Sequence, residues 1–261
     1  MTSVRPPAVA GLFYPGDAAT LRASVVEYLA ATQAAGAPPK AIIAPHAGYV
    51  YSGPIAAAAY ARLSPARETI TRVVLLGPAH RVAFEGLAVP DADAFTTPLG
   101  SVPLDREAIE RITALPQVRT FDAAHAQEHS LEVHLPFLQE VLGDFRLVPL
   151  VAGDATAEEV GEVLDALWGG PETLIVISSD LSHYHDYDSA RRLDRATSQA
   201  IETLRPQDIG YDQACGRIPV NGLLVVAKRR GLHATTLDLR NSGDTAGSRD
   251  RVVGYGAWVF E

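Results

Sequence analysis

Short, wholly apolar runs alternate with alanine-rich or amphipathic stretches along most of this chain. The runs are too short for helices and carry few polar residues, so they predict strands buried on both faces of a sheet. Strands separated by helices favour an α/β fold, a three-layer αβα sandwich around a mostly parallel or mixed central sheet. The predicted strands are residues 41–44, 72–76, 86–90, 145–151, 173–178, 234–239 and 251–260.

Helices are predicted where apolar residues recur every three or four positions and a capping residue precedes them. Asp17 is a candidate N-cap, and Pro54 and Pro219 suit the first turn of a helix. Residues 91–105 are polar and interrupted by proline, which predicts a loop or hairpin. The predicted helices are residues 18–34, 54–62, 105–114, 131–142, 155–168, 187–204 and 216–230.

Length and composition fit one compact α/β domain over residues 1–261, although the length alone would also allow two domains. The net charge of −9, without basic runs, argues against nucleic acid and against a membrane surface as partners. Neither a membrane-spanning run nor a secretory signal is recognisable, so a cytoplasmic location is expected. Cys215 is the only cysteine, which rules out an internal disulfide.

Three histidines follow predicted strands. His46 comes after 41–44, His80 after 72–76, and His183 after 173–178. In open α/β sheets, ligands sit beyond the carboxyl ends of the strands. If these strands are parallel neighbours, the three imidazoles converge there, and each offers one nitrogen lone pair to a transition metal.

Cys215 directly precedes the helix predicted at 216–230. The N–H groups and dipole of a helix N-terminus lower the pKa of a thiol and favour the thiolate, which binds metal or reacts. Cys215 is therefore a fourth candidate for the site. The alternative is a small buried apolar residue, the commonest fate of a free cysteine.

The segment EHSLEVH carries two more candidates, Glu128 and His129. It differs from the HExxH zinc-protease motif, because its histidines are five residues apart and lie on different faces of a helix. Glu128 and His129 are candidates for hydrogen bonding or proton transfer, with capping or a salt bridge as the alternative for Glu128. Asp180, in SSDLSH, is a candidate for orienting a ligand, unless Ser178, Ser179 or Asp180 caps a helix.

Five motifs, APHAGYVYSGP, LLGPAH, EHSLEVHLPF, SSDLSHYH and CGRIPVNGLL, occur in this order in a known family. On these motifs the chain resembles the Memo-like proteins, nearly from end to end. The resemblance implies a fold similar to that of the class III extradiol dioxygenases, which are non-haem iron enzymes. It also implies metal ligands at His46, His80 and Cys215, with His183 beside them. Cysteine stands where those dioxygenases have a carboxylate, and its softer thiolate makes copper or zinc plausible beside iron.

The expected function is iron- or copper-dependent redox or dioxygenase-like chemistry on a small organic substrate, with iron as the first choice of metal. His183 is the expected proton donor or acceptor, and Glu128, His129 and Asp180 are further catalytic candidates. One alternative is a non-catalytic scaffold that binds a peptide or protein in the same pocket. Another is a zinc-dependent hydrolase with Glu128 as general base. The resemblance also implies protein partners, including a radical S-adenosylmethionine protein.

Overall fold

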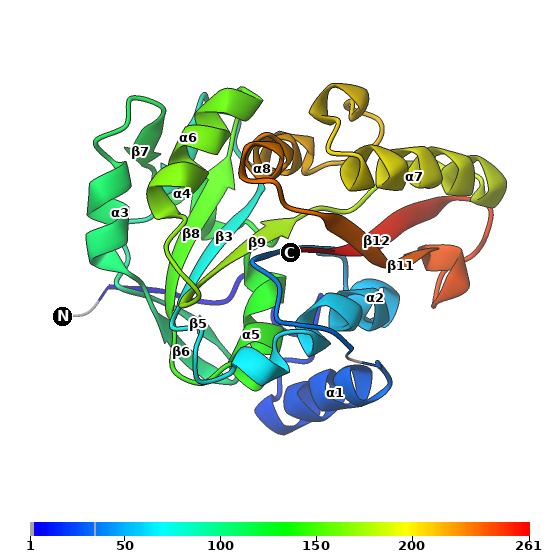
Figure 1. Ribbon diagram of the computed structural model, residues 1–261. Helices are drawn as coiled ribbons and strands as arrows, with labels where there is room; N and C mark the ends of the chain where they lie inside the picture. The colour runs from blue at the N-terminus through cyan, green and yellow to red at the C-terminus, as the bar shows by residue number, and fades with distance from the viewer. Residues whose placement is uncertain (1–2, 34) are drawn as a thin grey trace.

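The computed structural model describes residues 3–33 and 35–261. In this part of the chain, a mixed sheet of nine strands lies between two layers of helices, which confirms the three-layer αβα sandwich (Figure 1). Its strands are β2 (Ala41–Ala44), β3 (Arg72–Pro78), β4 (Leu87–Val89), β7 (Val118–Thr120), β8 (Arg146–Ala152), β9 (Thr173–Ser178), β10 (His183–His185), β11 (Ala234–Asn241) and β12 (Val252–Phe260).

The centre of the sheet is parallel. Strand β9 lies between β2 and β3, and β8 continues the parallel set on the far side of β3. Strand β12 pairs antiparallel with β2, and β4 pairs antiparallel with β8. Residues of β2 and β9 are all buried, because helices cover both faces. The adjacency of β2, β9 and β3, on which the convergence of the histidines depends, is therefore present.

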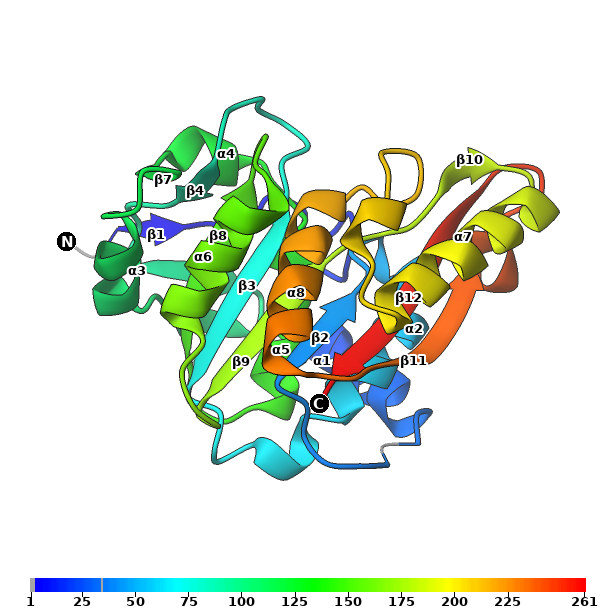
Figure 2. The same cartoon turned by 45° about the horizontal axis from the view of Figure 1, so that its top comes forward.

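The helices are α1 (Ala18–Ala30), α2 (Tyr49–Ala61), α3 (Arg106–Ile112), α4 (Asp122–Ala126), α5 (Leu135–Val141), α6 (Ala157–Leu167), α7 (Tyr187–Glu202) and α8 (Arg217–Arg230). Helices α1, α2 and α5 pack together on one face of the sheet, and α6 and α8 pack on the other (Figure 2). Helix α7 lies beside α8 over β11 and β12. Among these helices, none is both long and apolar enough to cross a membrane.

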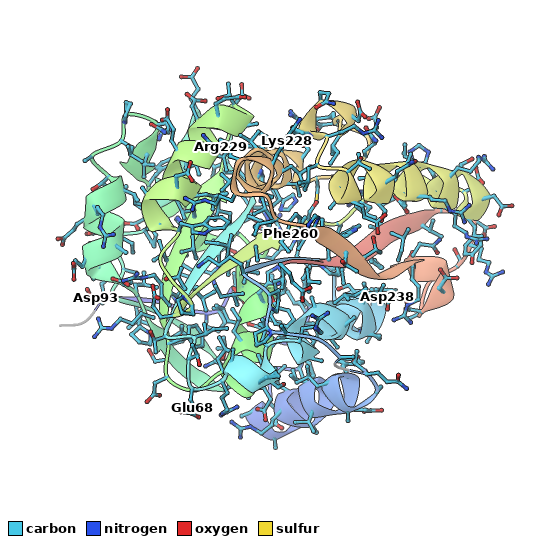
Figure 3. The ribbon with its side chains drawn as sticks, viewed as in Figure 1. Glu68, Asp93, Lys228, Arg229, Asp238 and Phe260 are labelled. Carbon is cyan, nitrogen blue, oxygen red and sulfur yellow. The ribbon has the colours of Figure 1, made fainter. Side chains whose placement is uncertain are left out.

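A second, smaller sheet joins the N-terminal segment to the region that was expected to be a loop or hairpin. The hairpin is present as β5 (Ala94–Thr97) and β6 (Gly100–Pro103), and β1 (Val4–Arg5) pairs in parallel with β5. Phe260 is fully buried near the middle of the molecule, whereas Glu68 and Asp93 lie at its periphery (Figure 3).

Local capping explains where several helices begin. The Asp17 carboxylate accepts a hydrogen bond from Thr20 N, which confirms Asp17 as the N-cap of α1. Thr156 and Glu159 form a reciprocal capping box at the start of α6. At the C-terminal end of α8, Gly231 adopts a left-handed conformation with φ 69°, which ends the helix.

Three predicted helix boundaries need correction. Helix α2 begins at Tyr49, five residues before the predicted start at Pro54, and its main-chain N–H at Tyr49 donates to Phe13 O. Residues 131–142 begin as a 3₁₀ turn (Glu132–His134) before α5. Helix α1 ends at Ala30, and its predicted end at residue 34 lies outside the described residues.

Candidate functional site

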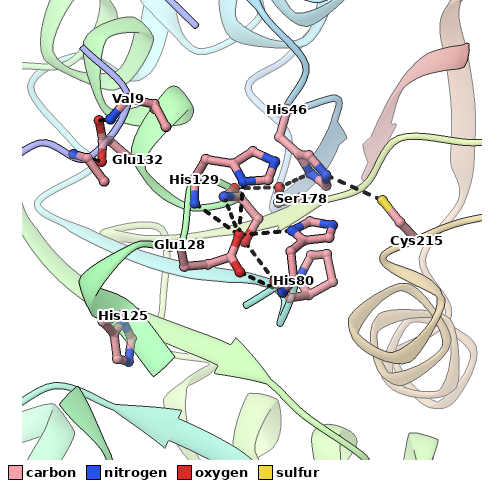
Figure 4. A network of polar contacts seen from close by, with 12 residues as sticks. Val9, His46, His80, His125, Glu128, His129, Glu132, Ser178 and Cys215 are labelled. Atoms are coloured by element: carbon pink, nitrogen blue, oxygen red, sulfur yellow. Dashed lines mark hydrogen bonds and ion pairs between the residues drawn. The ribbon is translucent and has the colours of Figure 1, made fainter. Parts of the chain in front are cut away.

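Two histidines and the cysteine meet at the carboxyl edge of the parallel strands. His46 follows the end of β2, His80 follows the end of β3, and Cys215 lies two residues before α8. One potential ligand atom from each of these three residues lies within 4.8 Å of the others (Figure 4). Segments that are far apart in the sequence thus bring two imidazoles and one thiol to a common point.

The ring of His46 is held in one tautomer by two serines. Its Nδ1 lies 2.6 Å from Ser178 Oγ, and the Ser178 hydroxyl donates to Ser130 O at 2.6 Å. A hydroxyl has a single proton, so Ser178 Oγ accepts from His46 Nδ1–H. His46 Nε2 is left with its lone pair and faces Cys215 Sγ at 3.3 Å.

Glu128 fixes His80 in the same way. The Glu128 carboxylate accepts from His80 Nδ1 at 2.9 Å and from His80 N at 2.6 Å, and it also accepts from the main-chain N–H groups of His129 and Ser130. His80 therefore carries its proton on Nδ1 and keeps the Nε2 lone pair for a ligand. Burial alone would raise the pKa of Glu128, but the bonds from His80 and Ser130 outweigh it and lower that pKa to about 2.

Cys215 is partly buried in the loop before α8. Its Sγ lies 3.6 Å from Asp180 O as well as near His46. Burial, followed by the nearby Asp180 charge, raises the pKa of the Cys215 thiol. The lowering of this pKa that a helix N-terminus predicts is opposed here by burial, because loss of hydration disfavours the thiolate.

Asp180 connects the strand-end loops. Its Oδ1 accepts from His46 N at 2.8 Å, and its main-chain oxygen accepts from Cys215 N at 3.3 Å. Ser178, Ser179 and Asp180 do not begin a helix of their own, because strand β10 follows this segment. Ser179 Oγ does accept from Gly216 N at 3.0 Å, at the start of α8. Burial raises the pKa of Asp180 to about 7. Asp180 thus links the two chain segments that carry His46 and Cys215.

His129 and His183 adjoin the three-residue cluster. The His129 ring stacks on His80 with ring centres 4.7 Å apart, and burial lowers the pKa of His129 to about 4. His183 lines the same cavity, but among the described residues it is outside the group of three. Its Nδ1–H donates to Leu181 O at 2.8 Å, which leaves Nε2 with a lone pair.

Comparison with known proteins agrees with this arrangement. The model of the Memo-like protein family matches residues 5–259. The chain belongs to this family. A MEMO1 family protein of Aquifex aeolicus is 36% identical over 271 residues, covering 98% of this chain and 99% of the relative. A MEMO1 family protein of Ignicoccus hospitalis is 37% identical over 283 residues, covering 98% of each.

Among solved structures, an uncharacterized protein of Escherichia coli K12 overlaps 82% of this chain and 98% of its own. Its sequence identity is 15% and its TM-score 0.47, so no conclusion is drawn from the overlap. The similarity to class III extradiol dioxygenases stays a prediction.

In this Memo-family protein the donors fit a transition metal. Two imidazole nitrogens with free lone pairs and a sulfur suit iron, copper or zinc, and they do not suit magnesium or calcium, which prefer oxygen. A second group of potential ligands, His80, Glu128 and His129, shares His80 with the first. Its carboxylate already accepts four N–H bonds, so it is better explained as support for His80.

The cluster opens into a cavity of about 1200 Å³ that is in contact with solvent. His46, His80, His129, Asp180, His183 and Cys215 all line this cavity. Glu128 does not line it and is 2% exposed. The room beside the cluster is sufficient for a small organic molecule.

The other histidine of the EHSLEVH segment has a structural role. His134 is buried and its Nδ1 bonds to Tyr60 OH at 2.7 Å, away from the cavity. Glu132, also buried, accepts from Arg5, from Tyr14 OH and from the main chain at Ala8 and Val9. It thereby anchors the N-terminal segment beneath the loop that carries Glu128.

The residues that sequence analysis missed are Ser178, as the partner of His46, and Ser130, as its acceptor. Both are fully buried. The only local signal was a serine at the end of an apolar strand, and that signal was interpreted as a possible helix cap.

Proposed function

We propose that this Memo-family protein binds a transition metal through His46, His80 and Cys215 and performs redox chemistry on a small organic molecule. Iron is the first choice of metal, with copper or zinc as alternatives. One observation carries the proposal. Two histidines with the proton fixed on Nδ1 and a cysteine approach one another within 4.8 Å beside an open cavity.

The residues around this cluster have different proposed roles. Ser178 and Glu128 orient the two imidazoles, and Asp180 ties the loops that carry His46 and Cys215. A bound metal with an open coordination position would supply Lewis-acid or redox chemistry. His183, with a free Nε2 toward the cavity, would accept or donate the proton that the reaction moves.

The two alternative functions are a zinc hydrolase and a peptide-binding scaffold. A zinc hydrolase needs a general base, and Glu128 is buried, fully hydrogen-bonded and has a pKa of about 2. We therefore do not propose Glu128 as a base. A peptide-binding scaffold would use the same cavity without turnover. An activity assay distinguishes it from an enzyme.

Metal analysis is the first test. The protein is purified under reducing conditions without added metal, and iron, copper and zinc are then measured. Wild-type protein is expected to hold near-stoichiometric metal, and His46→Ala and Cys215→Ala are expected to lose it. His233→Ala is the matched control, because His233 is exposed and outside the cavity. Equal metal content in all four proteins would contradict the proposal.

Turnover is the second test. Oxygen uptake with Fe(II) and a panel of catechols and other small phenols is compared for wild type and His183→Gln. We expect His183→Gln to keep its metal and lose turnover by roughly two orders of magnitude or more, as for loss of a proton-transfer group. Inactivity of the metal-loaded wild type on the whole panel would favour the scaffold.

A protein partner, including a radical S-adenosylmethionine protein, stays a prediction from the family resemblance. Affinity capture with wild-type protein and with a cavity variant such as His183→Gln tests it. Loss of a captured partner in the variant would place the contact at the cavity.

A further inference from the structure

Two arginines, Arg217 and Arg81, line the cavity beside the His46, His80 and Cys215 cluster without a carboxylate partner among the described residues. Arg217 is the first residue of α8, is partly buried, and its Cζ lies 5.6 Å above the ring centre of Tyr211. Arg81 follows His80, and its charge contributes to the low pKa of His129. Within residues 3–33 and 35–261, neither guanidinium forms an ion pair or side-chain hydrogen bond.

Every other arginine that is buried or partly buried in the described chain pairs with a carboxylate; these are Arg5, Arg62, Arg72, Arg106 and Arg240. Apart from Arg217, the described arginines that lack such a pair are exposed. A guanidinium has five N–H donors and matches the two oxygens of a carboxylate in a fixed geometry. Arg217 is partly buried in a cavity beside the His46, His80 and Cys215 cluster and has no such acceptor among the described residues, which indicates that a ligand supplies one. Arg81 is exposed and lines the same cavity, where it can contact the same ligand.

The charge around the cavity limits what this anion can be. Asp154, Asp180 and Asp212 also line it, and the whole chain carries a net charge of −9. A dianion such as a phosphate monoester would be repelled more strongly by these carboxylates than a monoanion would. A single carboxylate is therefore the better match to Arg217 and Arg81.

The cavity also offers two aromatic rings. Tyr211 is 82% exposed and Tyr184 is 65% exposed, although both are large side chains that usually pack. Tyr184 has φ 64°, and it lies where the pairing of β10 with β12 shifts register between His183 and His185. Such a backbone conformation is unfavourable for a residue other than glycine and, at a bulge, redirects a side chain. Here it places an aromatic ring at the cavity.

We propose that the cavity binds a small monocarboxylic acid with a flat apolar body, its carboxylate held by Arg217 and Arg81 and its body against the tyrosine rings. The inference rests on the proposed function, because this acid would be the substrate that reacts at the proposed metal site. Binding of the carboxylate itself depends only on the two arginines.

Calorimetric titration tests the proposal with four probes: benzoate, its neutral analogue benzamide, acetate, and inorganic phosphate. Benzoate is expected to bind at least about tenfold more tightly than benzamide, as for loss of a charge-assisted hydrogen-bonded pair. It should also bind more tightly than acetate, which lacks the ring, and more tightly than phosphate. Equal binding of benzoate and benzamide, or tighter binding of phosphate, would overturn the proposal.

Variants locate the site. Arg217→Gln and Arg81→Gln are each expected to weaken benzoate binding by about tenfold, and Arg217→Lys by less. Arg191→Gln is the matched control, because Arg191 stacks on Tyr187 at 5.5 Å outside the cavity. Thermal unfolding of each variant separates lost binding from lost structure. Unchanged benzoate affinity in folded Arg217→Gln and Arg81→Gln protein would refute the assignment.

Each titration is made before and after treatment with a chelator. Arginine-dependent benzoate binding by protein that takes up no metal would uphold this inference and contradict the proposed metal site. Protein that binds metal but shows no preference for benzoate over benzamide would contradict this inference and leave the proposed metal site supported.

Discussion

The imidazole Nδ1 of His46 and the hydroxyl oxygen of Ser178 lie 2.6 Å apart, and Ser178 in turn donates to Ser130 O. This relay gives a strand-end histidine a defined tautomer that suits a metal ligand, because it leaves Nε2 unprotonated on the side of Cys215. All three residues of the relay are buried, so water does not substitute easily for the serine.

Ser178→Ala is therefore expected to lower metal affinity by about 10- to 100-fold, the usual effect of removing a hydrogen-bond partner of a metal-binding histidine. Competition with a chromophoric chelator measures the affinity. Ser182→Ala is the matched control, since Ser182 Oγ is buried without a hydrogen-bond partner among the described residues. Similar losses of affinity in both variants would show that the relay is not the cause.

Glu128→Gln keeps the side chain's size but replaces one acceptor with a donor. All four groups that hydrogen-bond to the Glu128 carboxylate are N–H donors, so the new amide must face one of them. We expect the free energy of unfolding to fall by about 1 to 3 kcal/mol, and metal affinity to fall by about 10- to 100-fold. Urea denaturation and chelator competition measure the two effects.

Glu110→Gln controls for the change of charge, because Glu110 is exposed on α3 and has no side-chain partner in the described chain. An unfolding free energy for Glu128→Gln equal to that of Glu110→Gln would mean that the carboxylate does not hold the loop.

The sequence predicted the fold and the convergence of His46 and His80 for a simple physical reason. Wholly apolar runs such as 173–178 identify strands that are buried on both faces. In a parallel sheet, ligands bind beyond the carboxyl ends of such strands. His46 and His80 could therefore be selected before the strand order was known. Five ordered motifs then pointed to the Memo-like family, which the family match confirms.

What the sequence did not predict depends on contacts between distant segments. The Ser178–His46 bond exists because β9 lies beside β2, and the raised pKa of the Cys215 thiol exists because surrounding chain excludes water. The start of α2 was missed because Pro54 suits the first turn of a helix, whereas in the structure Pro54 lies inside α2. In the structure Gly53 lies within α2, and a Cβ there would be 2.7 Å from the Tyr28 ring, so its role is close packing.

Gly216, the N-cap of α8, shows a similar close approach beside the candidate metal ligand Cys215. A Cβ at this position would lie 2.4 Å from Ser178 O, a main-chain atom that cannot move aside. Gly216→Ala is expected to lower the free energy of unfolding by about 1 to 3 kcal/mol or more. It should also reduce metal binding, because Cys215 must shift with the start of the helix.

Chemical denaturation and metal analysis check this prediction together. Gly210→Ala is the control, since a Cβ there meets only a glutamine side-chain oxygen at 3.4 Å. Its stability is expected to change by less than about 1 kcal/mol. A Gly216→Ala protein as stable as Gly210→Ala would show that α8 can move away from β9 without loss.

Asp194 predicts a dependence of stability on pH. It is buried, its Oδ1 accepts from Ser182 N, and burial raises its pKa to about 6 from the ordinary 3.8. A raised carboxyl pKa means that the folded state binds more protons than the unfolded state between these values, so stability falls as pH rises through them.

Asp194→Asn removes the ionisation and should be more stable than wild type at pH 7, by up to roughly 3 kcal/mol. This advantage should shrink toward pH 4. Guanidinium denaturation at both pH values measures it, with exposed Asp250→Asn as the control. A stability difference that does not vary with pH would contradict the prediction.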